Sequence, residues 1–537
     1  MIFKSYVTRL KNEFSGYNLQ KLSKDLLAGI TVTAVALPLA LAFGEACGAS
    51  AGAGLITAII AGLVMSILAG ASYQISGPTG AMSAILVGIV GASGGLQSVF
   101  VVSVMAGILI LLCAVFKLGR LVSLIPRPVI TGFTSGIALT IALGQIDNFF
   151  GTTSTGDGPI QKIISYFQNG FNLNWRALLI GGIVVALMIA WPKKWNSKVP
   201  SSLVGIILAT VIAVVFGFDE KMALVGEIPQ TLLLEDRFSF SAIDFKSIPS
   251  YISPAISIAA LALIESLLCG ASASKMKGEE FDANQEIIAQ GVGNIIVPMF
   301  GGVPATAAIA RTSVAIKSGA QTRLCGIIHA LGLLVSMFLL APVMAKIPLS
   351  ALAGVLMVTA WRMNEWEEIK TIFSKKLIGG IVEFLATMIA TIVFDLTIAI
   401  VIGIALSAIM YIFNSSKAGV EITEAEKDEI KVKIAYVKGP LFFANASKLE
   451  KELSVELNGQ EKLIISLKEV NAIDTSGVTM LYEKLEHFTK DNVSVIICEA
   501  SDKVLSMLEK MNIKGLLGDE GVVDTLDQAL NKAKECN

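Results

Sequence analysis

The sequence has few of the residues that hold metals or form disulfide frameworks. Its 537 residues include only two histidines, His329 and His487, and six cysteines. None of these eight residues lies at the spacing of a metal site or a disulfide framework, so we interpret all of them as structural or incidental. The sequence therefore predicts no metal and no cofactor. The cysteines are Cys47, Cys113, Cys269, Cys325, Cys498 and Cys536.

Charge is scarce as well. Charged residues make up 16% of the chain, against about 25% in an average soluble protein, and the formal net charge is -1. No basic, aromatic-rich stripe suggests nucleic acid as a partner. No nucleophile–base pair, metal motif or nucleotide motif suggests an enzyme. In contrast, 54% of the residues are hydrophobic, and this composition indicates a protein of the cell membrane in contact with lipid.

Long apolar runs fill the chain as far as residue 414. A transmembrane helix needs about 20 apolar residues, and breaks at polar and Gly/Pro clusters divide the runs into fourteen expected spans. The expected transport domain is thus residues 25–414, after a cytoplasmic segment 1–24. The spans are 25–45, 50–70, 77–92, 97–116, 125–146, 176–191, 200–217, 251–273, 284–300, 304–318, 324–344, 348–362, 377–394 and 396–414.

The charges of the loops predict the orientation. Five basic residues precede the first span, and the loops expected on the same side are also basic. The loop 218–250, expected on the other side, is acidic. By the positive-inside rule, and because the number of spans is even, we expect a multi-pass protein with both termini in the cytoplasm.

The pattern changes after the last span. From residue 430 to 537, strand-like runs such as "KLIISL" alternate with amphipathic helical stretches such as "GVTMLYEKLEHF". This alternation predicts a small cytoplasmic α/β domain. The charged residues 415–429 are expected to be its linker.

Two pairs of motifs indicate an internal repeat. "GPTGAMSA" at 77–84 has a partner in "VPATAAIA" at 303–310, and their prolines, Pro78 and Pro304, are 226 residues apart. "IPRPVITG" at 125–132 and "IPLSALAG" at 347–354 lie at a similar offset of 222. We infer two halves of seven spans, about 25–217 and 251–414. Because seven is odd, the second half must be inverted in the membrane.

The prolines of the first motif pair suggest helices that begin inside the membrane. Such a helix leaves its first N–H groups unpaired, and proline suits its first turn. Two positive helix ends that point toward each other near the midplane would favour an anion, although a kink satisfied by neighbouring helices is the alternative. Small residues (Gly77, Gly80, Ala81, Ala305, Ala307 and Ala308) are expected to leave room for the ligand, and Thr79, Ser83 and Thr306 to offer hydroxyl donors.

Two ionisable residues within the expected spans are functional candidates. Glu265, in "LALIESLLCG", lies in mid-span with no basic residue within a helical turn. It is a candidate for carrying a coupling proton or binding a cation, and a neutral, structurally hydrogen-bonded acid is the alternative. Arg311 lies about two turns after Pro304, where it either adds positive charge to the site or extends toward the cytoplasm.

These motifs resemble those of the SulP anion permeases, a family that includes sulfate transporters. The likeness runs in order through "AGITVTAVALPLALAFG" at 28–44, "SGPTGAMSA", "GGVPATAAIARTSVAIKSGAQT" at 301–322, and a terminal domain similar to STAS with "DTSG" at 474–477. The resemblance implies a 7+7 inverted repeat divided into core and gate subdomains, with the anion held between the third and tenth helix starts. It also implies elevator-like alternating access and a homodimer.

The same resemblance assigns residues. The substrate-binding positions would be Gly77, Pro78, Thr79, Gly80 and Ala81, together with Thr306, Ala307, Ala308, Ile309, Ala310 and Arg311. Glu265 occupies the position at which family members keep an acid for proton or sodium coupling, and Cys269, four residues on, favours protons. Ser476 matches a serine that is phosphorylated in related anti-sigma-factor antagonists, and a helix-capping serine is the alternative.

We therefore expect a secondary active transporter of a small anion, sulfate or a dicarboxylate, with proton symport through Glu265. The alternatives are a sodium-coupled bicarbonate transporter, an uncoupled anion exchanger or channel, and a membrane sensor that signals through the terminal domain. Sequence alone does not choose the anion, because backbone N–H groups select charge more than shape.

Overall fold

The computed structural model describes residues 2–93, 95–117, 119, 125–155, 159–192, 195, 199–243, 246–394, 396–415, 419–427, 430–453, 462–518 and 520–535. An α-helix overlaps every one of the fourteen expected spans. In chain order they are α2 (Leu19–Ala46), α3 (Ala51–Leu68), α4 (Gly80–Ser93), α5 (Gly95–Val115), α6 (Arg127–Gly144), α9 (Trp175–Ala190), α11 (Ser201–Val215), α12 (Ile248–Lys277), α13 (Ala283–Ile296), α14 (Ile309–Lys317), α15 (Leu324–Met344), α16 (Leu349–Met363), α18 (Ile378–Val393) and α19 (Leu396–Ser415).

These helices differ in whether they are long and apolar enough to cross a membrane. In the described part of the chain, six helical segments have the length and apolar composition to cross a membrane: α2, α3, α5, α12, α15 and the stretch 127–150. At 1.5 Å per residue, the nine residues of α14 extend only about 14 Å, about half of the hydrocarbon core. The number of complete crossings therefore stays a prediction.

Shorter helices that the hydropathy pattern did not predict lie before and between the long ones. They are α1 (Ile2–Glu13), α7 (Ile146–Phe150), α8 (Pro159–Asn169) and α17 (Trp366–Ser374). An ion pair of 2.7 Å between Arg323, before α15, and Glu13 holds α1. In the segment expected only to be cytoplasmic, residues 2–13 are thus helical and attached to the helices that follow.

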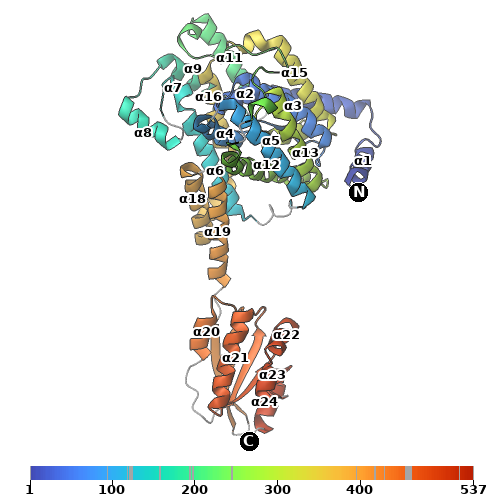
Figure 1. Ribbon diagram of the computed structural model, residues 1–537, viewed down its shortest axis with the longest axis vertical. Helices are drawn as coiled ribbons and strands as arrows, with labels where there is room; N and C mark the ends of the chain where they lie inside the picture. Colours follow the sequence, from blue (N-terminus) through green and yellow to red (C-terminus); the bar gives the residue numbers. More distant parts are fainter. Residues whose placement is uncertain are drawn as a thin grey trace. The chain divides into compact units, whose positions relative to one another are not determined.

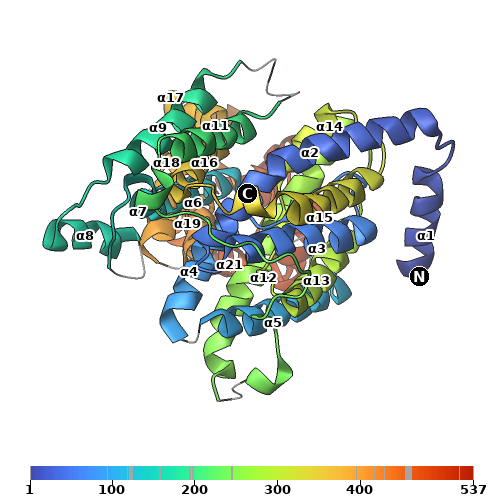
Figure 2. The same cartoon turned by 90° about the horizontal axis from the view of Figure 1, so that it is seen from above.

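The helices of the first unit, residues 1–404, form two groups. Contacts join α2, α3, α4, α5, α12, α13, α14 and α15 in one group and α6, α9, α11, α16 and α18 in the other. Figure 2 shows the two groups on opposite sides, with α2, α4 and α16 near the boundary. Contacts of α2 with α16 and of α4 with α6 connect them. We call them the core group and the gate group.

Two short strands lie inside the core group, where the sequence broke its helical pattern. β1 (Ser76–Gly77) precedes α4 and β2 (Thr306–Ala307) precedes α14. They pair antiparallel, Ser76 with Ala307 and Gly77 with Thr306. Residues before a proline avoid the helical region, and this preference suits Gly77 to an extended strand before Pro78.

The second unit, residues 405–537, contains an α/β domain. Its sheet has the order β3-β4-β5-β6-β7, in which β3 and β4 are antiparallel and the other neighbours parallel. The strands are β3 (Gly419–Lys427), β4 (Ile430–Lys438), β5 (Lys462–Glu469), β6 (Ser494–Cys498) and β7 (Val522–Val523), and the helices are α20 (Ala446–Leu453), α21 (Thr475–Lys490), α22 (Asp502–Lys510), α23 (Ile513–Leu517) and α24 (Leu526–Glu535).

Alternate residues of the central strands pack on opposite faces of this sheet. Leu463 and Ile465 of β5 share a core with α20, α21 and α22, whereas Ile464 packs with α24. Figure 1 shows these helices beside the strands. Burial on both faces explains why β5 is a continuous apolar run rather than an alternating one.

The prediction that residues 415–429 are a linker is wrong for residues 419–427, which form β3. This strand pairs with β4 along its whole length, from Gly419 with Lys438 to Lys427 with Ile430. The charged residues misled the prediction, although Val420 and Ala425 pack on opposite faces of the sheet, as residues of a strand can.

Candidate functional site

The candidate site is built around the β1–β2 ladder. The prediction that helices open at Pro78 and Pro304 is wrong in detail, because α4 begins at Gly80 and α14 at Ile309. Pro78 therefore lies two residues before its helix and Pro304 five residues before its helix. The predicted interruption is present at both places, and the extended backbone at each break pairs with that of the other half.

Buried polar side chains satisfy the backbone around this ladder. The amide of Asn294 on α13 accepts from Ala305 N and donates to Ala305 O, both at 2.9 Å. Thr57 on α3 accepts from Val303 N at 2.7 Å, and Thr312 on α14 accepts from Ile75 N at 3.0 Å. Unpaired backbone in a membrane costs several kcal/mol for each group, so these contacts are what permit non-helical chain at this depth. Sequence reasoning missed Asn294, one of four amide side chains in the expected span 284–300.

This arrangement gives a direct prediction for Asn294. In Asn294→Leu the buried N–H and C=O of Ala305 lose their partner, at about 1–3 kcal/mol for each group. We expect a lower unfolding temperature and weaker anion binding, as measured by thermal unfolding of the purified protein with and without sulfate.

The matched control is Asn284→Leu, on the first turn of the same helix, where the amide oxygen has no partner among the described residues. It should change the unfolding temperature little. Equal losses in the two variants would show that the contact of Asn294 with Ala305 is not what holds the ladder.

The expectation that small residues leave room for a ligand is wrong at two glycines. A Cβ on Gly77 would lie 2.6 Å from Nη1 of Arg311, and one on Gly80 would lie 2.3 Å from Cδ1 of Ile141 on α6. The space beside these glycines is therefore filled by side chains of the protein. Gly77 makes room for the guanidinium, and Gly80 permits close packing of α4 against the gate group.

The three hydroxyls expected as donors are already engaged within the protein. The hydroxyl of Thr79 donates to Oε2 of Glu265 at 3.0 Å, and that of Ser83 contacts the carbonyl oxygens of Thr79 and Phe43 at 3.1 and 3.2 Å. The hydroxyl of Thr306 lies 2.8 Å from that of Ser266. The groups left for an anion are therefore the first N–H groups of α4 and α14, which have no partner inside their own helix.

Arg311 lies at this site, and its side chain is 1% exposed. Its Nη2 donates to the carbonyl oxygen of Pro78 at 2.8 Å, across the ladder from its own helix. Nη1 has no partner among the described residues. The guanidinium thus presents an unused donor and a buried positive charge beside β1, and the alternative that it extends toward the cytoplasm is wrong.

Glu265 lies on α12, partly exposed, on the same side of the ladder. Its carboxylate accepts from the hydroxyl of Thr79, next to Pro78, whose carbonyl oxygen Arg311 contacts. The hydroxyl oxygen of Thr79 lies 3.4 Å from the N–H of Met82, in the first turn of α4. The acid, the arginine and the N-terminus of α4 therefore form one connected group.

A small cavity of about 80 Å³ lies beside the first turns of α4. Ser83 and Ala84 line it from the core group, and Thr140, Ile141 and Gln145 line it from α6 and its end. Because water has about 30 Å³ for each molecule, this volume suits two or three waters or one small ion.

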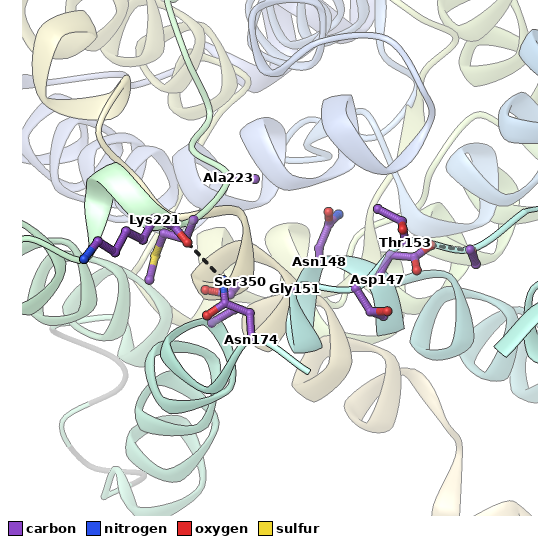
Figure 3. A pocket seen from close by; sticks show the side chains of 12 residues that line it. Asp147, Asn148, Gly151, Thr153, Asn174, Lys221, Ala223 and Ser350 are labelled. Atoms are coloured by element: carbon purple, nitrogen blue, oxygen red, sulfur yellow. Dashed lines mark hydrogen bonds between the residues drawn. The ribbon is translucent and has the colours of Figure 1, made fainter. Parts of the chain in front are cut away.

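A larger cavity, of about 530 Å³, lies away from the ladder (Figure 3). Asp147 and Asn148 of α7 line one side, and Asn174, Lys221 and Ser350 line the other. Asn174 donates to the backbone oxygen of Lys221 at 2.9 Å, and the ammonium of Lys221 points away from Asp147. None of the predicted site residues lines this cavity.

In the second unit, Ser476 is exposed and is the second residue of α21. The interpretation of Ser476 as the helix cap is wrong, because the side chain of Asp474 caps α21 by accepting from Gly477 N at 2.8 Å. The hydroxyl of Ser476 is therefore accessible for modification.

Comparisons with known proteins agree with this architecture. Residues 22–390 match the model of the sulfate permease family, and residues 421–529 match that of the STAS domain. The putative sulfate transporter YvdB of Bacillus subtilis (strain 168) is 35% identical over 97% of this chain and 99% of its own length. The bicarbonate transporter BicA of Picosynechococcus sp. is 28% identical over 95% and 94%.

Among solved structures, that of the murine Solute Carrier 26 family member A9 anion transporter in the inward-facing state superposes with a TM-score of 0.84. It covers 99% of this chain and 95% of its own, at 17% sequence identity. This likeness shows that the two proteins share a fold.

Proposed function

The chain belongs to the sulfate permease family and is an anion transporter, and from this premise we propose that it takes up a small anion together with protons. Sulfate or a dicarboxylate is the proposed substrate. The putative sulfate transporter YvdB, 35% identical along nearly the whole chain, supports sulfate. The 28% identity to a bicarbonate transporter favours bicarbonate as the second candidate, with sodium in place of the proton as coupling ion.

The proposed anion site lies between the N-termini of α4 and α14. The N–H groups of Gly80, Ala81, Ile309 and Ala310 supply the donors, and the two helix dipoles add positive potential. Nη1 of Arg311 is a further donor, with a full charge. The other predicted site residues position the site through the backbone of the ladder and its flanks, and not through free hydroxyls. They are Gly77, Pro78, Thr79, Thr306, Ala307 and Ala308.

The hydrogen bond from Thr79 to Glu265 is the observation that carries proton coupling, because it places the acid at the start of α4, beside the Pro78 carbonyl that Arg311 contacts. While the acid is ionised, it neutralises the guanidinium, and the site has little attraction for an anion. A proton on Glu265 removes that negative charge and leaves Arg311 to attract the substrate. Proton and anion thus favour each other's binding, as symport requires, since such coupling is reciprocal.

Movement of the core group against the gate group is the proposed transport step, an elevator-like alternating access. Both halves of the site belong to the core group, so one body carries the anion, Glu265 and Arg311 together. A homodimer with both termini in the cytoplasm is the proposed assembly, and phosphorylation of Ser476 is its proposed control.

A flux assay on the full chain in proteoliposomes tests the proposal. We expect an inward proton gradient to drive accumulation of sulfate, fumarate or bicarbonate, and no accumulation without the gradient. Accumulation that needs a sodium gradient instead would select the sodium alternative. Flux that never exceeds equilibration under either gradient would reject active transport in favour of an exchanger or channel.

A further inference from the structure

His329 occupies an unusual place in the core group. It lies on α15 and is 0% exposed, yet neither of its ring nitrogens has a partner among the described residues. A neutral imidazole carries one N–H donor and one acceptor, and an unmet buried polar group is costly. A buried ionisable group inside a membrane domain is a functional candidate by default.

α3 connects this histidine to the anion site. A Cβ on Gly77 would lie 2.6 Å from Nη1 of Arg311 and 3.4 Å from Cα of Ala58. A Cβ on Gly62 would lie 3.7 Å from Cδ2 of His329. Ala58 and Gly62 are four residues apart on one face of α3, a rise of about 6 Å. Arg311 therefore lies near the turn of α3 at Ala58, and His329 lies beside the next turn at Gly62.

The next turn of this face adds a third polar group without a partner. Ser66 follows Gly62 by four residues, and its hydroxyl occupies the space where a Cβ on Gly326 would be, at 2.1 Å. Among the described residues this buried hydroxyl has no hydrogen bond. Three buried polar groups without a partner among the described residues therefore lie along α3, in order away from the ladder. They are Nη1 of Arg311, the His329 ring and the Ser66 hydroxyl. Buried polar groups of this kind are the ones that internal waters satisfy.

The other charged groups near His329 are committed elsewhere or lie at helix ends. α3 contains no charged residue, and α15 itself contains none. On α2, Asp25 accepts from Thr322 and Tyr17. Before α15, Arg323 is paired with Glu13. The remaining titratable groups on the neighbouring elements are Lys21, Lys24 and Glu45 on α2, Lys317 at the end of α14, and the thiol of Cys325 on α15.

We propose that His329 is a second proton-accepting group of the transporter, linked to the anion site through Arg311 along the face of α3 formed by Ala58, Gly62 and Ser66. An anion beside Arg311 offsets the positive charge that repels a proton on the imidazole. Binding of the anion therefore favours protonation of His329, and the two are carried together. This inference rests on the proposed anion site, and it gives the core group a second proton group besides Glu265.

The chain offers a clean test because it has only two histidines. His487 lies on α21, and its side chain is 70% exposed. In His487→Gln, His329 is the only imidazole, so histidine labelled with ¹⁵N reports on it alone by NMR of the full chain in lipid nanodiscs.

We expect the ¹⁵N signals of His329 to show a protonation step as the pH is lowered. Sulfate or fumarate should move the midpoint upward by about one unit, a tenfold gain in proton affinity. Arg311→Met should remove the anion-dependent shift. A ring that takes up no proton even with anion present, or a midpoint that neither anion moves, overturns the proposal.

Transport separates this inference from the proposed function. In His329→Gln and His329→Phe we expect proton-driven accumulation to fall about tenfold, while anion counterflow without a gradient stays within about twofold. A purely structural histidine would tolerate the aromatic replacement. Suppose that Glu265→Gln abolishes accumulation but both His329 variants retain it. This result would overturn the role of His329 and leave proton symport intact. If the unmodified protein accumulates no anion, the proposed function fails, and the NMR titration still decides whether proton and anion bind together.

Discussion

Replacement of Glu265 with glutamine is expected to abolish proton-driven anion accumulation while anion binding persists. Glutamine resembles the protonated acid, because it has no charge and its amide oxygen still accepts from the hydroxyl of Thr79, 3.0 Å away in the native protein. The positive charge of Arg311 is then permanently unneutralised. We expect sulfate or fumarate to bind at least as tightly as in the native protein and with a weaker dependence on pH, whereas accumulation under a proton gradient is lost.

The measurement is anion uptake into proteoliposomes with and without a pH gradient, together with equilibrium binding at several pH values. Glu45→Gln is the matched control, since Glu45 is also partly buried and accepts one hydrogen bond, from Ala51 N at 2.7 Å, but lies outside the site. It should retain coupled uptake. If Glu265→Gln retains it as well, proton symport through Glu265 is wrong.

Loss of the Arg311 guanidinium is the second change for which we expect a large effect. Arg311→Met keeps much of the apolar stem and removes both the buried charge and the donor at Nη1. A hydrogen bond to a charged group contributes about 1.5–3 kcal/mol, so the dissociation constant for the anion should rise roughly 10- to 100-fold. The carbonyl of Pro78 also loses its donor, so some loss of stability should accompany the weaker binding.

A control with another arginine separates these two effects. Nη2 of Arg362 on α16 donates to the backbone oxygen of Met188 at 2.6 Å, a contact like that of Arg311 with Pro78, but in the gate group. Arg362→Met should destabilise the protein without changing anion affinity. Equal losses of affinity in both variants would mean that Arg311 acts on the fold and not on the anion.

The helices could be predicted from the sequence because each depends on a local property. An apolar run of sufficient length must form its hydrogen bonds within itself in lipid, and hydropathy detects such runs whatever packs beside them. The polar helix α13 was found because it still contains enough apolar residues. Glu265 and Arg311 were found because a charge in an apolar run is visible without a structure.

The features that could not be predicted from the sequence depend on contacts between residues far apart in the chain. Nothing near Gly77 in sequence reveals that its free space is occupied by Arg311, or that Thr79 is bound to Glu265. The true helix starts at Gly80 and Ile309 were missed because the ladder, formed between two halves of the chain, decides where each helix begins. β3 was missed because its partner strand sets its conformation, whereas its charges alone indicate a loop.

The β1–β2 ladder also has a consequence for how the selectivity of such a protein evolves. Ser76 is paired with Ala307 and Gly77 with Thr306. The geometry of each half of the proposed anion site therefore depends on the other half. A substitution that changes the backbone of one strand therefore also displaces the other strand, which a distant part of the gene encodes. Changes of substrate preference should therefore arise as paired substitutions, one from each half. A chimera that exchanges both strands with a relative should recover that relative's preference, whereas exchange of one strand alone should yield an inactive protein.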